Sequence, residues 1–160
     1  MTHKVPSSQH DERVFLAVPE GEWIASNEYA FAIFDRFPVS PGHALVITRR
    51  PVPTWFDADE REQAAVLDLV NRVKRQLDET LMPKPDGYNV GFNAGEAAGQ
   101  TVMHLHVHVI PRYVGDVPDP RGGVRFVIPE RANYLRAPRT DELDLTTGHP
   151  DSPLWERLAW

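Results

Sequence analysis

The sequence contains no cysteine, which rules out two kinds of chemistry from the start. Neither a disulfide framework nor a thiol nucleophile is available, and an intracellular chain is the default expectation. No apolar run approaches the length of a membrane span, and residues 1–11 are polar, without the apolar centre of a signal peptide. We therefore expect a cytoplasmic protein that does not contact membranes.

Positive charge is also scarce, since 17 Lys and Arg face 23 Asp and Glu and the formal net charge is −6. Non-specific binding to nucleic acid depends on neutralising phosphates with Lys and Arg, so we do not expect it, although a local basic patch would fit this composition. The 160 residues, 41% of them hydrophobic, suit one globular domain with a substantial core.

The chain does have a dense run of histidine, His104-Leu105-His106-Val107-His108. Because successive side chains of a β-strand point to opposite faces, this pattern puts three imidazoles on one face and apolar groups on the other. The apolar face requires a core, so the run predicts a half-buried strand whose histidines line a polar cleft.

Three interpretations of these histidines compete. The first is a solvent-facing strand that carries histidine by chance, which is disfavoured because only seven histidines occur in the whole chain. The second is a zinc site, but His104 and His108 would lie roughly 13 Å apart on an extended strand, so a pair would need a distant third ligand. The third is catalysis, with one imidazole as nucleophile or base and its neighbours binding a charged substrate. We favour the third.

The run from Gly99 to Arg112 resembles the signature of the histidine triad (HIT) nucleotide-binding proteins, and residues 91–100 extend the similarity upstream. Residues 38–47, Pro-Val-Ser-Pro-Gly-His-Ala-Leu-Val-Ile, are similar to a second motif of that family. The resemblance covers roughly residues 15–134. It implies a HIT-like fold of the α+β class, an antiparallel sheet with one long helix, and a homodimer that shares the sheet. We expect a flexible N-terminus at 1–13, the HIT domain at 14–135 and a C-terminal tail at 136–160.

Local patterns agree with this architecture. Strands are expected at residues 15–18, 29–34, 44–48, 88–93 and 104–110, from their β-branched, aromatic and alternating composition. A helical repeat of apolar residues comprises Val66, Leu69, Val70, Val73 and Leu77. This helix is expected to begin near Asp57, with Glu60 completing a capping box, and to end by residues 81–83.

A glycine-rich loop at residues 94–99 directly precedes the histidine strand. Glycine lets backbone N–H groups approach a phosphate closely, so the loop predicts a phosphate cradle, although such loops are a weak signal alone. By resemblance, Asn93, Gln100 and Thr101 contact the phosphate and the leaving group. Asp35 would bind the ribose hydroxyls by the same resemblance; taken alone it could equally be a turn former.

The resemblance also implies a mechanism. His106 attacks the α-phosphorus to form a nucleotidyl-histidine, and His108 contacts the phosphate or assists the leaving group. His104 and a buried His43 orient His106, and water completes the hydrolysis; without the resemblance, His43 would be a loop-end histidine facing water. No metal site or tightly bound cofactor is implied, although Mg²⁺ can accompany a polyphosphate substrate.

The expected function is hydrolysis at the α-phosphate of dinucleoside polyphosphates or related adenine nucleotide conjugates. Alternatives are nucleotidyl transfer to phosphate by the same chemistry, and a nucleotide- or zinc-binding module without turnover. Arg112, Arg121 and Arg125 either receive distal phosphates or are solvated. Residues 152–160 read as a short amphipathic helix that packs within a homodimer or against a further domain.

Overall fold

The computed structural model describes residues 14–133 and 135, and it divides the chain into two compact units, residues 1–116 and 117–160. The division after Asp116 falls earlier than the expected domain boundary at 135. The first unit contains the sheet, the long helix and all the predicted site residues. The expected tail and the amphipathic segment at 152–160 lie outside the described residues.

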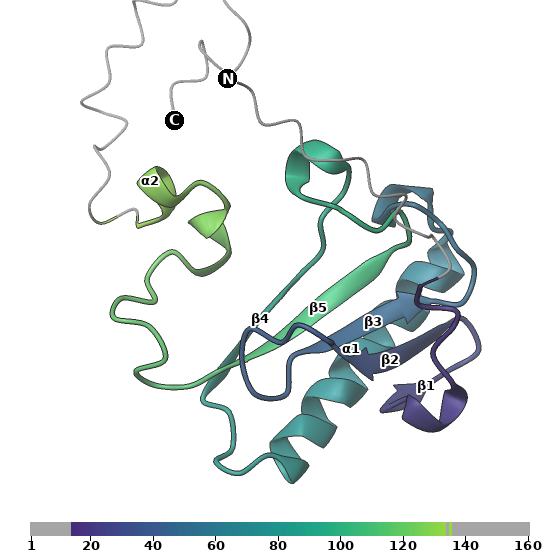
Figure 1. Ribbon diagram of the computed structural model, residues 1–160, viewed down its shortest axis with the longest axis horizontal. Coiled ribbons are helices and arrows are strands. Elements are labelled where there is room, and N and C mark those ends of the chain that lie inside the picture. The colour runs from purple at the N-terminus through teal and green to yellow at the C-terminus, as the bar shows by residue number, and fades with distance from the viewer. Residues whose placement is uncertain (1–13, 134, 136–160) are drawn as a thin grey trace, which may run out of the picture. The chain divides into compact units, whose positions relative to one another are not determined.

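One antiparallel sheet of five strands, in the order β1-β2-β3-β5-β4, organises the first unit. The strands are β1 Ala25–Ser26, β2 Ala30–Phe34, β3 Ala44–Thr48, β4 Gly87–Gly91 and β5 His106–Arg112 (Figure 1). The central strand β3 is buried throughout, and β2 is buried except at Phe34. The antiparallel sheet and single long helix predicted from the sequence are confirmed.

The long helix α1 spans Glu60–Thr80 and packs against one face of the sheet (Figure 1). Its capping box is formed by Asp59 and Glu62, and the predicted pairing of Asp57 with Glu60 is wrong. Asp57 instead closes a capping box with Thr54 on the short 3₁₀ helix η2, Trp55–Asp57, which precedes α1. Both aspartates satisfy the local preference for a cap, and the 3₁₀ turn takes the first one.

The two faces of the sheet bury different sets of side chains. Packed with α1 is a cluster that includes Ala30, Ala32, Ala44, Val46, Val66, Leu69, Val73, Leu77, Val107 and Val109. On the opposite face Phe15 and Val18 pack with Phe31, Ile33, Leu45 and Ile47. Burying each large apolar side chain contributes about 1.5–3 kcal/mol, so both faces stabilise the sheet.

Residues 15–18 form a turn, and the short strand predicted there is absent. The Val18 N–H donates to the Phe15 carbonyl at 3.2 Å, and both side chains pack into the same apolar cluster. A strand would have kept this backbone extended. As a turn, the segment covers the sheet face opposite α1, and the tertiary burial of Phe15 and Val18 outweighs their β propensity.

Four further short helices lie in the described parts of the two units, two in each. The 3₁₀ helices η1, Glu20–Glu22, and η3, Glu96–Ala98, belong to the first unit. The second unit contains η4, Gly123–Val127, and α2, Pro129–Ala132, tied together by Arg125, whose Nε donates to the Ala132 carbonyl at 3.1 Å. Within the described residues, no helix is both long and apolar enough to cross a membrane.

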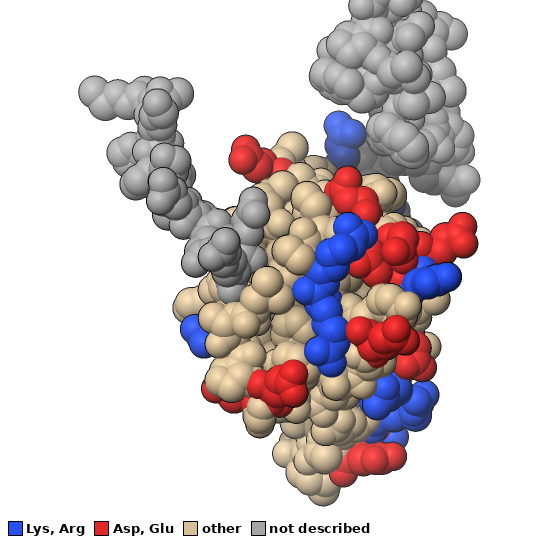
Figure 2. Space-filling model, turned by 90° about the vertical axis from the view of Figure 1, so that its right-hand side faces the viewer, with Lys and Arg blue, Asp and Glu red and all other residues tan. Residues whose placement is uncertain are grey.

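Charged side chains of both signs are intermingled on the face drawn in Figure 2. Among the charged side chains of the first unit, Lys74 pairs with Asp78 at 2.6 Å on α1, and Arg50 pairs with Glu62 at 2.7 Å. Glu62 is nearly buried, and its carboxylate accepts from both Nε and Nη2 of Arg50. This pair fixes the segment after β3 to the first turn of α1.

Candidate active site

His106 and His108 lie on the sheet face opposite α1. In the register between β3 and β5, Ile47 is opposite His106 and Leu45 is opposite His108, so these four side chains share a face.

His104 lies just before β5 and is completely buried. Its Nε2 lies 2.7 Å from the Thr48 carbonyl, and because that oxygen can only accept, the His104 ring donates to it.

The orientation of the His106 ring is set by a backbone carbonyl. Its Nδ1 lies 2.7 Å from the carbonyl oxygen of His104, so Nδ1 carries the proton and donates. In the neutral ring the other nitrogen, Nε2, then keeps its lone pair. The Phe15 ring packs 5.1 Å from the His106 ring, centroid to centroid, and limits its rotation. His106 is thus held in the tautomer that a nitrogen nucleophile requires.

The tautomer of His108 follows from a short chain of hydrogen bonds. The Val39 N–H donates to Nδ1 of the buried His43 at 3.3 Å, which leaves the His43 proton on Nε2. That Nε2 lies 3.0 Å from Nδ1 of His108 and donates to it. His108 therefore carries its own proton on Nε2, which becomes a hydrogen-bond donor.

Burial keeps both of these rings neutral. It is the main cause that lowers the pKa of His108 from 6.5 to about 4, and the nearby His106 and His43 act in the same direction against Asp35. Burial also lowers the pKa of His43, and the charge of Asp35 opposes this shift. At neutral pH the His43–His108 pair therefore carries no charge and retains its hydrogen bond.

Asp35 joins this chain from the turn after β2. One carboxylate oxygen accepts the Phe37 N–H at 2.8 Å, and the other lies 3.5 Å from Nδ1 of His43. The turn closes at Gly42, whose φ of 84° suits glycine and where a Cβ would collide with the Leu81 side chain. The turn leads into His43, whose ring contacts that of His108 on β5.

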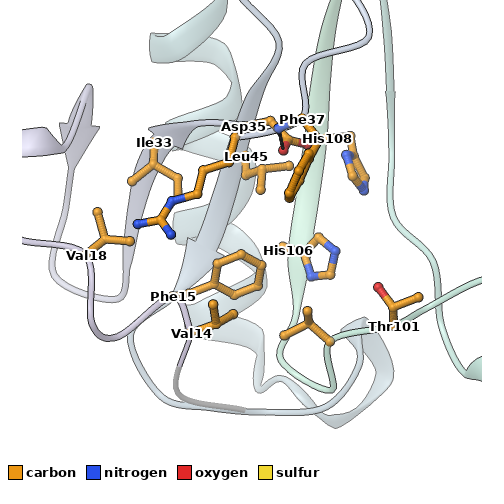
Figure 3. Close-up of a pocket in the computed structure, with 12 residues that line it drawn as sticks. Val14, Phe15, Val18, Ile33, Asp35, Phe37, Leu45, Thr101, His106 and His108 are labelled. Carbon is orange, nitrogen blue, oxygen red and sulfur yellow. Dashed lines mark hydrogen bonds between the residues drawn. The ribbon is translucent and has the colours of Figure 1, made fainter. Parts of the chain in front are cut away.

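A cavity of about 400 Å³ opens beside these groups (Figure 3). Asp35, Thr101, His106 and His108 supply its polar groups together with Arg36. The rest of the wall is apolar and consists of Val14, Phe15, Val18, Ile33, Phe37, Leu45 and Val102. A mostly apolar cavity with a few convergent polar groups is the usual form of a small-molecule site.

The glycine-rich loop is held by Gln100, which is almost fully buried. Its Oε1 accepts the Gly95 N–H at 2.8 Å, and its Nε2 donates to the carbonyls of Pro53, at 2.6 Å, and Val102, at 3.1 Å. Gly95 and Gly99 have φ values of 87° and 86°, which other residues rarely adopt. Gln100 thus ties the loop to the backbone at Pro53 and at Val102.

The sequence matches the HIT domain family over residues 18–115. The chain belongs to the HIT family. It is 41% identical over 90 residues to an uncharacterised HIT-like protein of Mycoplasma genitalium, covering 56% of this chain and 62% of that one. It is also 33% identical over 112 residues to an AP-4-A phosphorylase of Mycobacterium tuberculosis, covering 69% of this chain and 56% of that one.

A third relative is a bis(5'-nucleosyl)-tetraphosphatase (asymmetrical) of Schizosaccharomyces pombe, 38% identical over 79 residues, with 49% of this chain and 42% of that one covered. Among solved structures, a hypothetical histidine triad nucleotide-binding protein from Sulfolobus tokodaii superposes with a TM-score of 0.58 at 35% identity, covering 68% of this chain and 71% of that one. The chain thus spans only part of several HIT relatives, and relatives named for an activity act on nucleotides.

The HIT fold brings four of the predicted site residues to one cavity: Asp35, Thr101, His106 and His108. The other four lie elsewhere. His43 contacts His108, whose ring packs against that of His106, so the expected effect of His43 on His106 would pass through His108. His104 does orient His106, through its backbone carbonyl and not through its ring. Asn93 is not among the cavity-lining residues, and the Gln100 amide is engaged with the backbone.

Most of the apolar cavity wall was not identified from the sequence. Phe15 and Val18 fall within the strand predicted at residues 15–18, and Arg36 and Phe37 come just after the strand predicted at residues 29–34. Their only signal was proximity in sequence to Asp35 and to the N-terminal apolar run. The cavity forms because the turn at residues 15–18 folds over the sheet, and such a long-range contact has no local periodicity.

Asp35, His43 and His108 could also hold a metal ion, since one ligand atom from each lies within 4.8 Å of the others. Both nitrogens of His43 are already engaged, by the Val39 N–H and by His108, so metal binding would require the rings to turn.

The arginines expected to receive distal phosphates or to be solvated have partners within the protein: Arg112 with Asp116 at 2.6 Å, Arg121 with Asp119 at 2.7 Å, and Arg125 with backbone carbonyls.

Proposed function

We propose that this HIT protein hydrolyses dinucleoside polyphosphates, or related adenine nucleotide conjugates, at the α-phosphate through a nucleotidyl-histidine on His106. The observation that carries the proposal is the 2.7 Å hydrogen bond from His106 Nδ1 to the His104 carbonyl. It leaves the lone pair on Nε2 of a ring that lines the cavity. A neutral imidazole in this tautomer is a competent nucleophile near neutral pH.

The reaction then proceeds in two displacements. His106 Nε2 attacks the α-phosphorus, the bond to the bridging oxygen breaks, and the polyphosphate half leaves with the bonding electrons. The Nε2–H of His108 donates a hydrogen bond to the bridging oxygen as charge develops on it. Water next attacks the phosphorus, the P–N bond breaks, the nucleoside monophosphate leaves and the water proton passes to solvent.

The substrate contacts divide along the cavity. The apolar wall of Phe15, Val18 and Ile33 suits a nucleobase, and the Asp35 carboxylate, which also lines the cavity, would accept hydrogen bonds from ribose hydroxyls. Thr101 and the glycine loop beside it would receive the α-phosphate, with Asn93 and Gln100 as the predicted contacts around it. Mg²⁺ would enter only with a polyphosphate, and no tightly bound cofactor is proposed.

Diadenosine tetraphosphate in oxygen-18 water tests this proposal. The expected products are AMP that carries the label and unlabelled ATP, because water attacks the nucleotidyl-histidine and not the leaving half. Two molecules of ADP in the absence of phosphate, or label in ATP, would mean attack at another phosphorus and would overturn the mechanism.

Nucleotidyl transfer to phosphate is the second candidate, and the similarity to the AP-4-A phosphorylase of Mycobacterium tuberculosis favours considering it. The same intermediate would then yield ADP only when inorganic phosphate is added. Running the labelled assay with and without phosphate separates the two acceptors. A third candidate is a nucleotide- or zinc-binding module without turnover, which predicts no products in either assay. Because Asp35, His43 and His108 could hold a metal ion, metal analysis of the purified protein tests the zinc-binding form of this candidate.

A homodimer with a continuous sheet is also proposed. Strand β4 lies at one end of the sheet order, next to β5 only, and its backbone edge could pair with that of a second copy. The molecular mass in solution tests the homodimer.

A cytoplasmic location is proposed from the composition of the sequence. Fractionating cells that produce the protein tests this location.

A further inference from the structure

Phe37 is an aromatic side chain that lines the cavity and yet is 85% exposed. In Figure 3 it lies among Asp35, Leu45 and His108. Large aromatic side chains are normally buried, so one that is presented to solvent beside a ligand cavity is a candidate binding group.

The backbone presents Phe37 in a defined position. Its N–H donates to the Asp35 carboxylate at 2.8 Å, and Pro38, which follows it, restricts its backbone to extended conformations. The other Asp35 oxygen faces His43, which in turn contacts His108. Phe37 is therefore connected to His108 through Asp35 and His43, and in Figure 3 it lies on the side away from Val18.

The size of the cavity leaves part of a dinucleotide outside it. Small-molecule sites occupy about 300–1,000 Å³, and a cavity of about 400 Å³ near the lower limit suits one nucleotide and not two. With the first nucleoside against the apolar wall and the α-phosphate at His106, the second nucleoside must emerge past His108. The exposed ring beside His108 is Phe37.

We propose that Phe37 is a stacking platform for the second nucleobase, the one on the leaving half of a dinucleoside polyphosphate. This inference rests on the proposed function for the position of the α-phosphate. Stacking on an aromatic ring accepts any base, since every base has a π face. The platform would therefore favour a substrate with two nucleosides over one with a small leaving group, without selecting which second base is present.

Binding measurements test the platform separately from catalysis. Calorimetry would compare AMP with a non-hydrolysable methylene-bridged diadenosine tetraphosphate, on wild type, Phe37→Ala and Phe37→Trp. Phe37→Ala should weaken the dinucleotide roughly 5- to 150-fold, the range that corresponds to the loss of one base–aromatic stack. AMP should be affected by less than about twofold, and Phe37→Trp should restore dinucleotide binding.

Phe56→Ala is the matched control. Phe56 is also a strongly exposed phenylalanine, at 78%, but it is not among the cavity-lining residues. It should leave both affinities unchanged, whereas an equal loss in the Phe56 and Phe37 variants would indicate a general effect of removing exposed aromatic surface and overturn the proposal.

Three other results would also overturn it. Equal weakening of AMP and the dinucleotide by Phe37→Ala would place the ring over the first nucleoside. Unchanged affinity for both would remove Phe37 from the site, and a change of molecular mass in solution would make it a contact between copies of the chain. Failure of the proposed function has a different signature, since wild type would then bind the dinucleotide tightly but release no AMP from the hydrolysable form.

Discussion

The Nε2 atom of His43 lies 3.0 Å from the Nδ1 atom of His108, although the two residues are 65 positions apart in the sequence. The contact makes the loop before β3 part of the site on β5. It fixes which nitrogen of His108 carries a proton, and so connects the Val39 backbone amide to a donor that can meet the leaving group. Four of the predictions below concern the hydrogen-bond series Val39–His43–His108 and Asp35, which lies beside it.

Replacing His43 should slow the reaction without removing the nucleophile. His43→Ala leaves Nδ1 of His108 without its donor, so the proton can occupy either nitrogen. We expect kcat to fall by about 10²-fold, a typical effect of disabling a proton-positioning group, with a small change in KM. Single-turnover kinetics of adduct formation would measure it. An unchanged kcat would mean that the His43–His108 bond has no part in catalysis.

The contribution of His108 to activity should persist in mildly acidic solution. Because burial lowers the pKa of His108 to about 4, its Nδ1 continues to accept from His43 well below the usual histidine range. We expect the ratio of kcat in wild type to kcat in His108→Gln to stay level from pH 8 to about 5 and to fall toward pH 4. A fall in kcat centred near pH 6.5 that His108→Gln abolishes would contradict the shifted pKa.

The same shift predicts a stability effect of definite sign. Between pH 6.5 and about 4 the unfolded chain binds a proton at His108 and the folded chain does not, so acidification destabilises the fold. The contribution of His108 is fully present above pH 6.5 and is lost as the pH falls toward 4. Denaturant unfolding across this range should therefore show a shallower pH dependence in His108→Gln, and identical slopes would argue against the assignment.

Replacing His106 should abolish turnover while nucleotide binding survives. His106→Ala removes the nitrogen that forms the intermediate but leaves the apolar wall and Asp35 in place. Mass spectrometry after an acid-free quench should find a nucleotidyl group on His106 of the wild type. A group attached to another residue, or wild-type turnover in the variant, would refute the assigned nucleophile.

Asp35 has two roles that different substitutions can separate. Asp35→Asn keeps an oxygen for the Phe37 N–H but removes the charge that would bind ribose, whereas Asp35→Ala removes both. Asp35→Asn should weaken ribonucleotides by about 10-fold and leave 2′,3′-dideoxy analogues unaffected, because only ribose offers the hydroxyls. Equal losses for the two kinds of ligand would make Asp35 purely structural.

Gln100 offers a test between a loop clamp and a direct phosphate contact. Gln100→Glu keeps the acceptor for Gly95 but removes both donors to the Pro53 and Val102 carbonyls. As a clamp, it should lose about 1–3 kcal/mol in the free energy of unfolding, since both carbonyls lose their donor and a new charge is placed at an almost fully buried position. Denaturant unfolding measures this loss. Weaker phosphate binding at unchanged stability would instead support direct contact.

Local physics in the sequence determined a large part of this protein. The alternation of histidine with apolar residues predicted a strand with one apolar face, although β5 begins at His106 and leaves His104 and Leu105 just before it. The apolar repeat from Val66 to Leu77 predicted the buried face of α1. These patterns succeed because each reflects the repeat of a single element, 2 residues for a strand and 3.6 for a helix. The spaced motifs also identified the family, which the comparison over residues 18–115 confirmed.

Only the tertiary structure decided how those elements meet. The partner of His43, the covering turn at Phe15 and Val18, and the cavity between them arise from contacts between distant segments, which leave no period in the sequence. The start of α1 was undetermined locally, since Asp57 and Asp59 each suit a capping box; in the structure Asp57 completes the box that Thr54 begins on the 3₁₀ helix, and Asp59 caps α1. The sequence thus determined which residues share a face, whereas long-range packing determined which faces and rings come into contact.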